Sequence, residues 1–170
     1  MRQLQLIHKK EKNSIIIKKI LEMMISLLIL SAICQAFSAV IDFESIGGIP
    51  HNNSYDVMYS NGQLFNNTVN SLQPHDVFVI PNRTYWLIGG IIASGLTNVK
   101  FVIDGTLSFS DDRDTWPKNS GGGVEECIYL SDLTDVTFTS SGKGTLDGNG
   151  QKWWGAINFL KHQVVFKHQV

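Results

Sequence analysis

The sequence predicts an all-β fold, a truncated right-handed parallel β-helix of about three coils, which follows an N-terminal signal helix. Three observations lead to this prediction. Short β-rich runs alternate with turns from Asp76 onward, and they recur at a constant spacing once a single insertion is set aside. After the N-terminal segment, no apolar pattern at three-and-four spacing persists for a dozen residues, so helices are not expected there.

The leader, residues 1–36, has the order of a secretory signal peptide. Basic residues precede the apolar run from Ile20 to Ile33, and small residues follow around Ala36. The run has 14 residues and contains Glu22, whereas a membrane-spanning helix needs about 20 mostly apolar residues. We therefore predict cleavage after Ala36 and a secreted product. The alternative is an uncleaved anchor, which would be the one link to a membrane, because the basic region is long.

The part that remains after cleavage is mildly acidic. The leader holds six of the 14 basic residues and two of the 15 acidic ones, which leaves a formal charge of −5. Such a surface gives no electrostatic footprint for nucleic acid, so a nucleic-acid partner is not predicted. Contacts to an acidic polysaccharide would have to be local, and the oligomeric state stays open.

Cys127 is the one cysteine that follows the leader, which excludes a disulfide framework. It lies in the apolar run 127–130. There we favour packing in the core, as a small hydrophobe, over pairing with a partner in a missing C-terminal part.

Three N-glycosylation sequons follow the leader, and their acceptors are Asn52, Asn66 and Asn82. All three lie in turn-like sequence. They agree with passage through a secretory pathway and are expected to mark surface loops.

Residues 37–75 are predicted to form a loosely structured N-terminal cap. The segment is rich in Asn, Gly and Ser, with turn signals at Gly47-Gly48 and at Asn61-Gly62. A repeat stack needs a terminal unit of this kind because its first coil would otherwise expose an apolar face.

The coils themselves are predicted over residues 76–163. Val77, Val99 and Val136 each follow an Asp or Asn, at spacings of 22 and 37 residues. If the 15 residues 110–124 are an insertion, the second spacing also becomes 22, which fits one coil of a solenoid. An antiparallel sandwich of short strands is the alternative. Two local echoes favour the solenoid: Leu96-Thr97-Asn98-Val99 with Leu133-Thr134-Asp135-Val136, and Asp104-Gly105-Thr106-Leu107 with Gly144-Thr145-Leu146-Asp147-Gly148.

The run Gly142-Lys143-Gly144-Thr145-Leu146-Asp147-Gly148-Asn149-Gly150, followed by Trp153-Trp154-Gly155, resembles the signature of polygalacturonase-like enzymes, glycoside hydrolase family 28. The strands after Asp76 and Asn98 resemble the opening coils of pectin-active β-helices. Roughly residues 40–161 are covered. The resemblance implies a parallel β-helix and a secreted, cell-wall-directed hydrolase of glycosidic bonds in a pectin-type polysaccharide.

The same resemblance implies that the catalytic carboxylates follow the tryptophan pair. The family's Asn-Thr-Asp, Gly-His-Gly and Arg-Ile-Lys motifs are absent from this sequence, since Asn67-Thr68 is followed by Val69. The pair Asp111-Asp112 precedes the tryptophans and is interpreted as part of a charged surface loop. We therefore predict no catalytic residue in this sequence and regard the chain as an inactive N-terminal fragment. No cofactor or metal is expected, because the histidines show no ligand spacing.

Three tryptophans are candidates for contact with a glycan, because apolar rings stack on sugar faces. They are Trp116, in the insertion, and Trp153 and Trp154, for all of which packing is the favoured interpretation. If their rings are exposed, the alternative function is a non-catalytic glycan-binding β-helix module. In the tail, residues 164–170, a repeat of Lys-His-Gln-Val departs from the family, and we expect it to reflect truncation, alternative splicing or a gene-model error.

Overall fold

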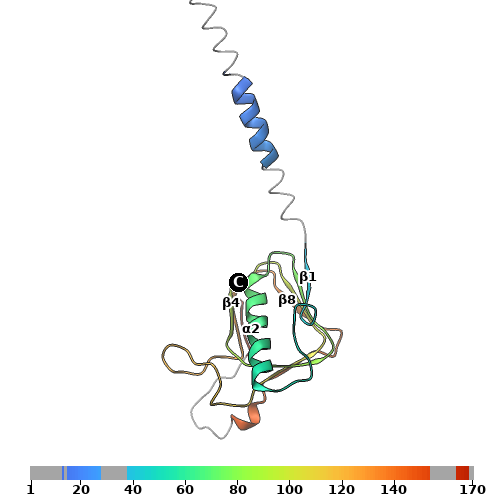
Figure 1. Cartoon of the computed structure of the whole chain (residues 1–170), viewed down its shortest axis with the longest axis vertical. Helices are drawn as coiled ribbons and strands as arrows, with labels where there is room; N and C mark the ends of the chain where they lie inside the picture. The colour runs from blue at the N-terminus through green and yellow to red at the C-terminus, as the bar shows by residue number, and fades with distance from the viewer. Residues whose placement is uncertain (1–12, 14, 28–37, 154–163, 169–170) are drawn as a thin grey trace, which may run out of the picture. The chain divides into compact units, whose positions relative to one another are not determined.

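The computed structural model describes residues 13, 15–27, 38–153 and 164–168, and the chain divides into two units, Met1–Phe37 and Ser38–Val170. In the first unit, residues 15–27 are helical (Figure 1). Within the described residues, no helix is both long and apolar enough to cross a membrane. The predicted cleavage site after Ala36 lies outside the described residues.

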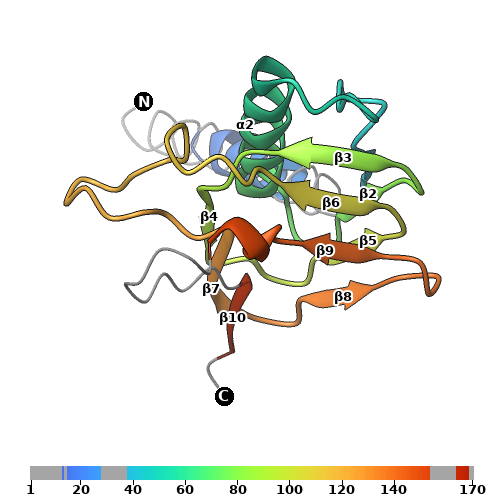
Figure 2. The same cartoon turned by 90° about the horizontal axis from the view of Figure 1, so that it is seen from below.

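The second unit contains three sheets of short strands (Figure 2). Sheet A has the order β1 (Val40–Asp42), β2 (Val77–Ile80), β5 (Lys100–Ile103) and β8 (Thr137–Thr139). Sheet B has the order β3 (Thr84–Leu87), β6 (Thr106–Phe109) and β9 (Thr145–Asp147). Sheet C has the order β4 (Ile91–Ser94), β7 (Ile128–Leu133) and β10 (Val164–His168).

After β1, the chain passes through the three sheets in the same order three times. Each passage A to B to C adds one strand to every sheet, and all neighbouring strands among these ten pair in parallel. The alternative of an antiparallel sandwich was therefore wrong. The segment predicted as a tail contributes β10, which pairs with β7.

The register of sheet A confirms one predicted spacing and corrects the other. Lys100 pairs with Thr137, so the second spacing is 37 as predicted. Val77 pairs with Lys100 and not with Val99, so the first spacing is 23 and the predicted alignment was wrong by one residue.

The error has a physical cause in the corner before sheet A. His75, Asn98 and Asp135 are the stacked corner residues, all with positive φ, and the His75 N–H donates to the Asn98 carbonyl. Asn and Asp favour this left-handed conformation, and His adopts it less often. The sequence therefore suggested Asp76 as the corner, when the corner residue is His75.

The predicted insertion is confirmed between β6 and β7. The link from sheet B to sheet C takes residues 88–90 in the first passage and residues 110–127 in the second. An isolated antiparallel bridge between Lys118 and Val124 closes this longer loop on itself. The 15 additional residues project from the stack without disturbing the pairing of β4 with β7.

The core consists of side chains that stack in register from one passage to the next. Phe78, Phe101 and Phe138 form one column in sheet A, with ring centroids 6.1 Å and 4.7 Å apart. Tyr85 and Leu107 align in the same way in sheet B and are fully buried. Each passage thus buries its apolar face against the next, as expected for a repeat stack.

The cap differs from the prediction because it contains a helix. Helix α2 (Tyr55–Ser71) has 17 residues and lies against β3 and β4 (Figure 2). The expectation of an all-β part after the leader, with a loosely structured cap, was therefore wrong. The buried face of α2 carries polar and small residues as well as apolar ones, so it shows little apolar periodicity: Asn61, Gly62, Phe65, Thr68 and Val69.

Candidate functional site

The insertion and the short 3-10 helix η1 (Gly150–Lys152) together line an open surface depression of about 600 Å³. It is the place where the polar residues of the glycine-rich signature meet the charged loop. Its lining is charged: Asp111, Asp112, Arg113, Asp114 and Lys152.

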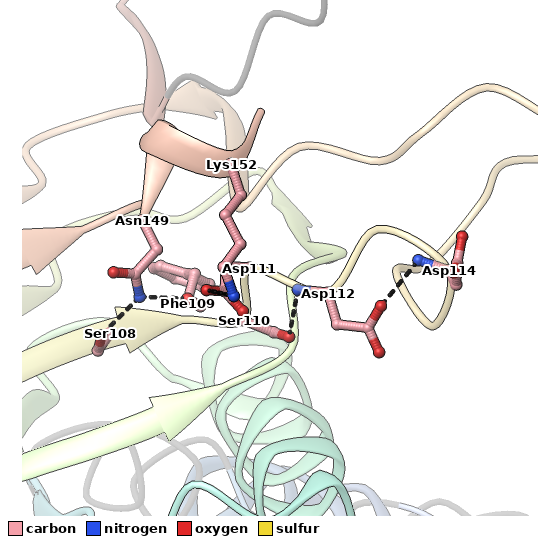
Figure 3. A network of polar contacts seen from close by, with 8 residues as sticks. All are labelled: Ser108, Phe109, Ser110, Asp111, Asp112, Asp114, Asn149 and Lys152. Carbon is pink, nitrogen blue, oxygen red and sulfur yellow. Dashed lines mark hydrogen bonds and ion pairs between the residues drawn. The ribbon is translucent and has the colours of Figure 1, made fainter. Parts of the chain in front are cut away.

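A turn after β9 places η1 over the preceding passage. Asn149 has φ of 46°, a left-handed conformation that asparagine tolerates, and its N–H donates to the Asp147 Oδ1 at 2.9 Å. Its Nδ2 donates to the Ser108 Oγ at 2.9 Å and to the Phe109 carbonyl at 2.7 Å (Figure 3). The Asp-Gly-Asn-Gly turn therefore ties the third passage to β6.

Lys152 connects η1 to the insertion. Its Nζ lies 2.6 Å from the Asp111 Oδ2, and both side chains are substantially exposed. An ion pair in water contributes about 0–1 kcal/mol, so this contact positions more than it stabilises.

Asp112 holds the conformation of its own loop. Its carboxylate accepts the Asp114 N–H at 3.0 Å and the Thr115 hydroxyl at 2.9 Å. The pKa of Asp112 is lowered, first by the hydrogen bond from the Asp114 backbone and then by that from Thr115, with a smaller contribution from the charge of Lys152. The group therefore stays ionised at neutral pH.

These contacts decide what the aspartate pair can do chemically. Glycosidic hydrolysis needs one carboxylic acid that stays protonated to give its proton to the leaving oxygen, with a raised pKa. Asp112 has the opposite shift, and Asp111 forms an ion pair with a lysine. The geometry supports a role in loop conformation, as the sequence suggested.

Two of the three candidate tryptophans pack against each other. Trp116 is 2% exposed and Trp153 is 5% exposed, and their rings pack edge to face with centroids 5.1 Å apart. The Trp116 Nε1 donates to the Glu125 carbonyl at 2.8 Å, and a Cβ at Gly89 would overlap the Trp116 ring. Neither ring presents its face to a sugar in this arrangement, which favours packing. Trp154 lies outside the described residues.

Arg113 completes this layer from the solvent side. Its guanidinium carbon lies 5.8 Å from the centroid of the Trp153 ring, within the range of a cation–π contact. The sequence marked the tryptophan pair, but the partner of Trp153 comes from the insertion. No local pattern reveals that long-range pairing, nor the contact of Asn149 with β6.

Cys127 is buried, and burial raises the pKa of its thiol to about 12. A thiolate nucleophile at neutral pH is therefore disfavoured. In the part of the chain that the structure describes, no three His, Cys, Asp or Glu side chains gather in a way that could hold a metal ion.

The three sequon asparagines lie in different surroundings. Asn52 and Asn82 are exposed in loops, as expected. Asn66 is half-buried within α2, so the expectation that all three sequons lie in turns was wrong for this one.

Comparison with known proteins relates slightly less than half of the chain to named enzymes. The probable endo-xylogalacturonan hydrolase A of Aspergillus oryzae is 32% identical over 80 residues, which are 46% of this chain and 18% of that protein. The polygalacturonase of Persea americana is 30% identical over 80 residues (46% and 16%), and the exopolygalacturonase of Cochliobolus carbonum is 33% identical over 78 residues (45% and 18%).

These alignments span less than a fifth of the length of the curated relatives that the chain matches. No protein-family model matches the chain, and no solved structure matches it significantly.

Proposed function

We propose, because this chain contains a polygalacturonase-like region, that it supplies the first coils of a secreted glycoside hydrolase directed at pectin-type polysaccharide. In this proposal the described residues that follow the leader form part of the scaffold of that enzyme. The groups that cleave the glycosidic bond belong to further coils, so these 170 residues do not themselves hydrolyse the polymer.

The fold proposed for this region is a right-handed parallel β-helix. Three passages through three parallel sheets in constant order support it, because a solenoid adds one strand to each sheet per coil. The right hand follows from the strong preference of parallel crossover connections for that hand.

The observation that carries the proposal is that three residues of the glycine- and tryptophan-containing signature make structural contacts. Asn149 bonds to β6, Lys152 pairs with Asp111, and Trp153 packs on Trp116. Asn149 thus holds the third coil against β6 of the preceding coil, and Lys152 and Trp153 hold it against the insertion. A signature used in this way is a structural element of the hydrolase and leaves acid–base chemistry to other residues.

A non-catalytic glycan-binding module is the competing proposal. It needs aromatic rings with exposed faces, and the burial of Trp116 and Trp153 weighs against it. The depression is lined by three aspartates, one arginine and one lysine, and this net negative lining does not attract an acidic polymer, so the scaffold proposal is preferred.

The test is an assay of the full chain for release of reducing ends from polygalacturonate and from xylogalacturonan. The polygalacturonase of Persea americana, assayed under the same conditions, shows that the assay detects turnover. We expect no release by this chain. Release that is lost in the double variant Asp111→Asn, Asp112→Asn would overturn the proposal and place the catalytic pair in the insertion.

Secretion and removal of residues 1–36 are part of the same proposal. They rest on the order of basic, apolar and small residues in the leader. Sequencing of the N-terminus of the mature product checks them, and a product that begins near Phe37 is expected. Retention of Met1 on a membrane-bound product would support the uncleaved anchor instead.

A further inference from the structure

The three sequons of this chain differ in whether the acceptor amide is already used by the fold. A glycan is attached to the side-chain nitrogen of asparagine, next to a hydroxyl two residues later. The two groups must therefore reach solvent on the same side of the backbone. The three sites can be compared on that requirement.

Asn66 uses its side chain to cover an edge of sheet C. Its Oδ1 accepts the Ile92 N–H at 2.9 Å, and it also accepts the Asn70 Nδ2 at 3.3 Å. The Asn70 Nδ2 in turn donates to the Ile92 carbonyl at 2.8 Å. The two amides thus satisfy both backbone groups of Ile92 in β4, where a further strand would otherwise pair.

The hydroxyl of the same sequon is also withdrawn from solvent. Thr68 is buried, and its Oγ1 donates to the Leu64 carbonyl at 2.7 Å. Both residues are part of α2, in which positions i and i+2 do not face each other. A glycan on Asn66 would therefore conflict with the helix and with its contact to β4.

Asn52 meets the requirement. It is exposed, and its Oδ1 accepts the Ser54 N–H at 2.9 Å, which brings the asparagine and the hydroxyl residue together in a turn. This hydrogen bond engages the side-chain oxygen of Asn52. It therefore does not occupy the side-chain nitrogen, to which the glycan would be attached.

Asn82 also meets the requirement for an accessible acceptor. It is exposed in the tight turn between β2 and β3, and Thr84 follows at the first position of β3. The His51 N–H donates to the Thr84 carbonyl at 2.8 Å, so the loop before α2 runs beside this turn. The turn lies on the opposite side of the stack from the long insertion (Figure 2).

We propose that Asn52 and Asn82 are N-glycan acceptors that lie close together at the capped end, which is the end of the stack covered by β1 and α2. We propose further that Asn66 is an unmodified positioning residue that joins α2 to β4. The assignment rests on the proposed passage through the secretory pathway. It goes beyond that proposal because it separates three sequons that the sequence treats alike.

The experiment expresses the full chain in secreting cells in two forms. One keeps its own leader, and in the other residues 1–36 are replaced by a signal peptide of proven function. The protease-resistant, folded fraction is treated with peptide N-glycosidase, which converts each glycosylated asparagine to aspartate, and mass spectrometry locates the conversions. We expect conversion at Asn52 and Asn82 and none at Asn66.

Failure of the leader and failure of the site assignment give different results. Glycans in the second form alone refute secretion by the native leader and leave the assignment supported. Conversion at Asn66 in the folded fraction, or none at Asn52 or Asn82 in the second form, overturns the assignment.

Two variants at one position test the role given to Asn66. Asn66→Asp removes the sequon but keeps an oxygen that can accept the Ile92 N–H, whereas Asn66→Leu removes both. We expect Asn66→Asp to keep the wild-type yield of folded protein and Asn66→Leu to lower it several-fold, as destabilised proteins are removed by cells. Equal yields for the two variants would contradict the role in joining α2 to β4.

Discussion

The outermost strands at the two ends of the stack differ in how far they are covered by other elements. At one end, β1 pairs with β2, and α2 lies over β3 and β4 (Figure 2). At the other end, β8 and β9 have a described neighbour on one side only, and every residue in them is exposed. Phe138 and Leu146 are each 37% exposed there, whereas Phe43 at the capped end is fully buried.

The capped end shows that a helix can replace a strand as a hydrogen-bonding partner. The Met58 carbonyl accepts the Ile88 N–H at 2.9 Å, and the Asn61 Nδ2 donates to the Trp86 carbonyl at 3.0 Å. A side-chain amide offers the donor and acceptor of a peptide unit, so asparagines on α2 can satisfy a strand edge. Exposed edges otherwise pair with other chains, which is why the two ends should differ in stability and in association.

The largest expected effect is a difference between two phenylalanine truncations. Phe43 packs edge to face on Phe65, Phe78 and Tyr85, so Phe43→Ala should cost about 3–5 kcal/mol of unfolding free energy. Phe138 stacks on Phe101 but is partly solvated, so Phe138→Ala should cost about 1 kcal/mol. Denaturant titration followed by circular dichroism measures both, and equal losses would contradict the difference between the ends.

A smaller effect is expected from two glycines. A Cβ at Gly105 would overlap the carbonyl oxygens of Pro81 and Arg83, so Gly105→Ala should cost about 3 kcal/mol. Gly142, near the open end, has φ of 101° and no atom within 4 Å of such a Cβ, so Gly142→Ala should cost about 1 kcal/mol from backbone strain alone. The same titration compares the two, and a larger loss at Gly142 would mean that crowding inside the stack is relieved by backbone movement.

Next in size is a test of the amides that close the capped edge. Asn61 is almost fully buried, and its side chain bonds to the Ile49 N–H, the Ile49 carbonyl and the Trp86 carbonyl. Asn61→Ala leaves these groups without their partner and should cost about 2 kcal/mol.

Asn70→Ala is the matched control for Asn61→Ala, because Asn70 is exposed and water can replace it. We expect a loss of about 0.5–1 kcal/mol for Asn70. Hydrogen exchange at Trp86 and Ile88 gives a second readout of the edge. Faster exchange there in Asn61→Ala, with no change at β8, would place the effect at the capped end.

The coils could be predicted from sequence because the backbone conformation and crowding at their turns restrict which residue types fit there. Asn98 and Asp135 occupy left-handed corners, and Gly105 and Gly144 stand where a Cβ would strike backbone. Such positions admit few residue types, so they recur visibly from coil to coil. His75 meets the same demand with a less common residue, and there the alignment moved by one position.

The cap and the candidate site were less predictable for a different reason. Helix α2 buries Asn61 and Thr68 through hydrogen bonds, and such a face carries no apolar period. In the site, the tryptophan signature placed Trp153 correctly near a tight turn. Its contact with Trp116 joins residues 37 positions apart, and no local preference encodes that. Long-range polar and aromatic pairings are what the structure adds.

The smallest expected effects concern the pH dependence of stability, to which a tyrosine contributes at one end and an aspartate toward the other. At the capped end, burial and the hydrogen bond to Glu44 raise the pKa of Tyr85 well above 10.0. The stability contributed by its neutral form is complete below pH 10 and is lost as the pH rises above it. Toward the open end, the pKa of Asp104 is lowered below 3.8, mainly by the Ser141 backbone N–H at 2.6 Å. Its contribution is present above about pH 4 and is lost as the pH falls through the folded-state pKa.

Each limb of the pH profile should therefore respond to one variant. Tyr85→Phe should flatten the unfolding free energy above about pH 10, and Asp104→Asn should flatten it below about pH 4. The alkaline comparison is made in a Cys127→Ala background, because burial also raises the pKa of that thiol. An acid limb that persists in Asp104→Asn would mean that other carboxylates, such as Asp112 with its lowered pKa, dominate acid unfolding.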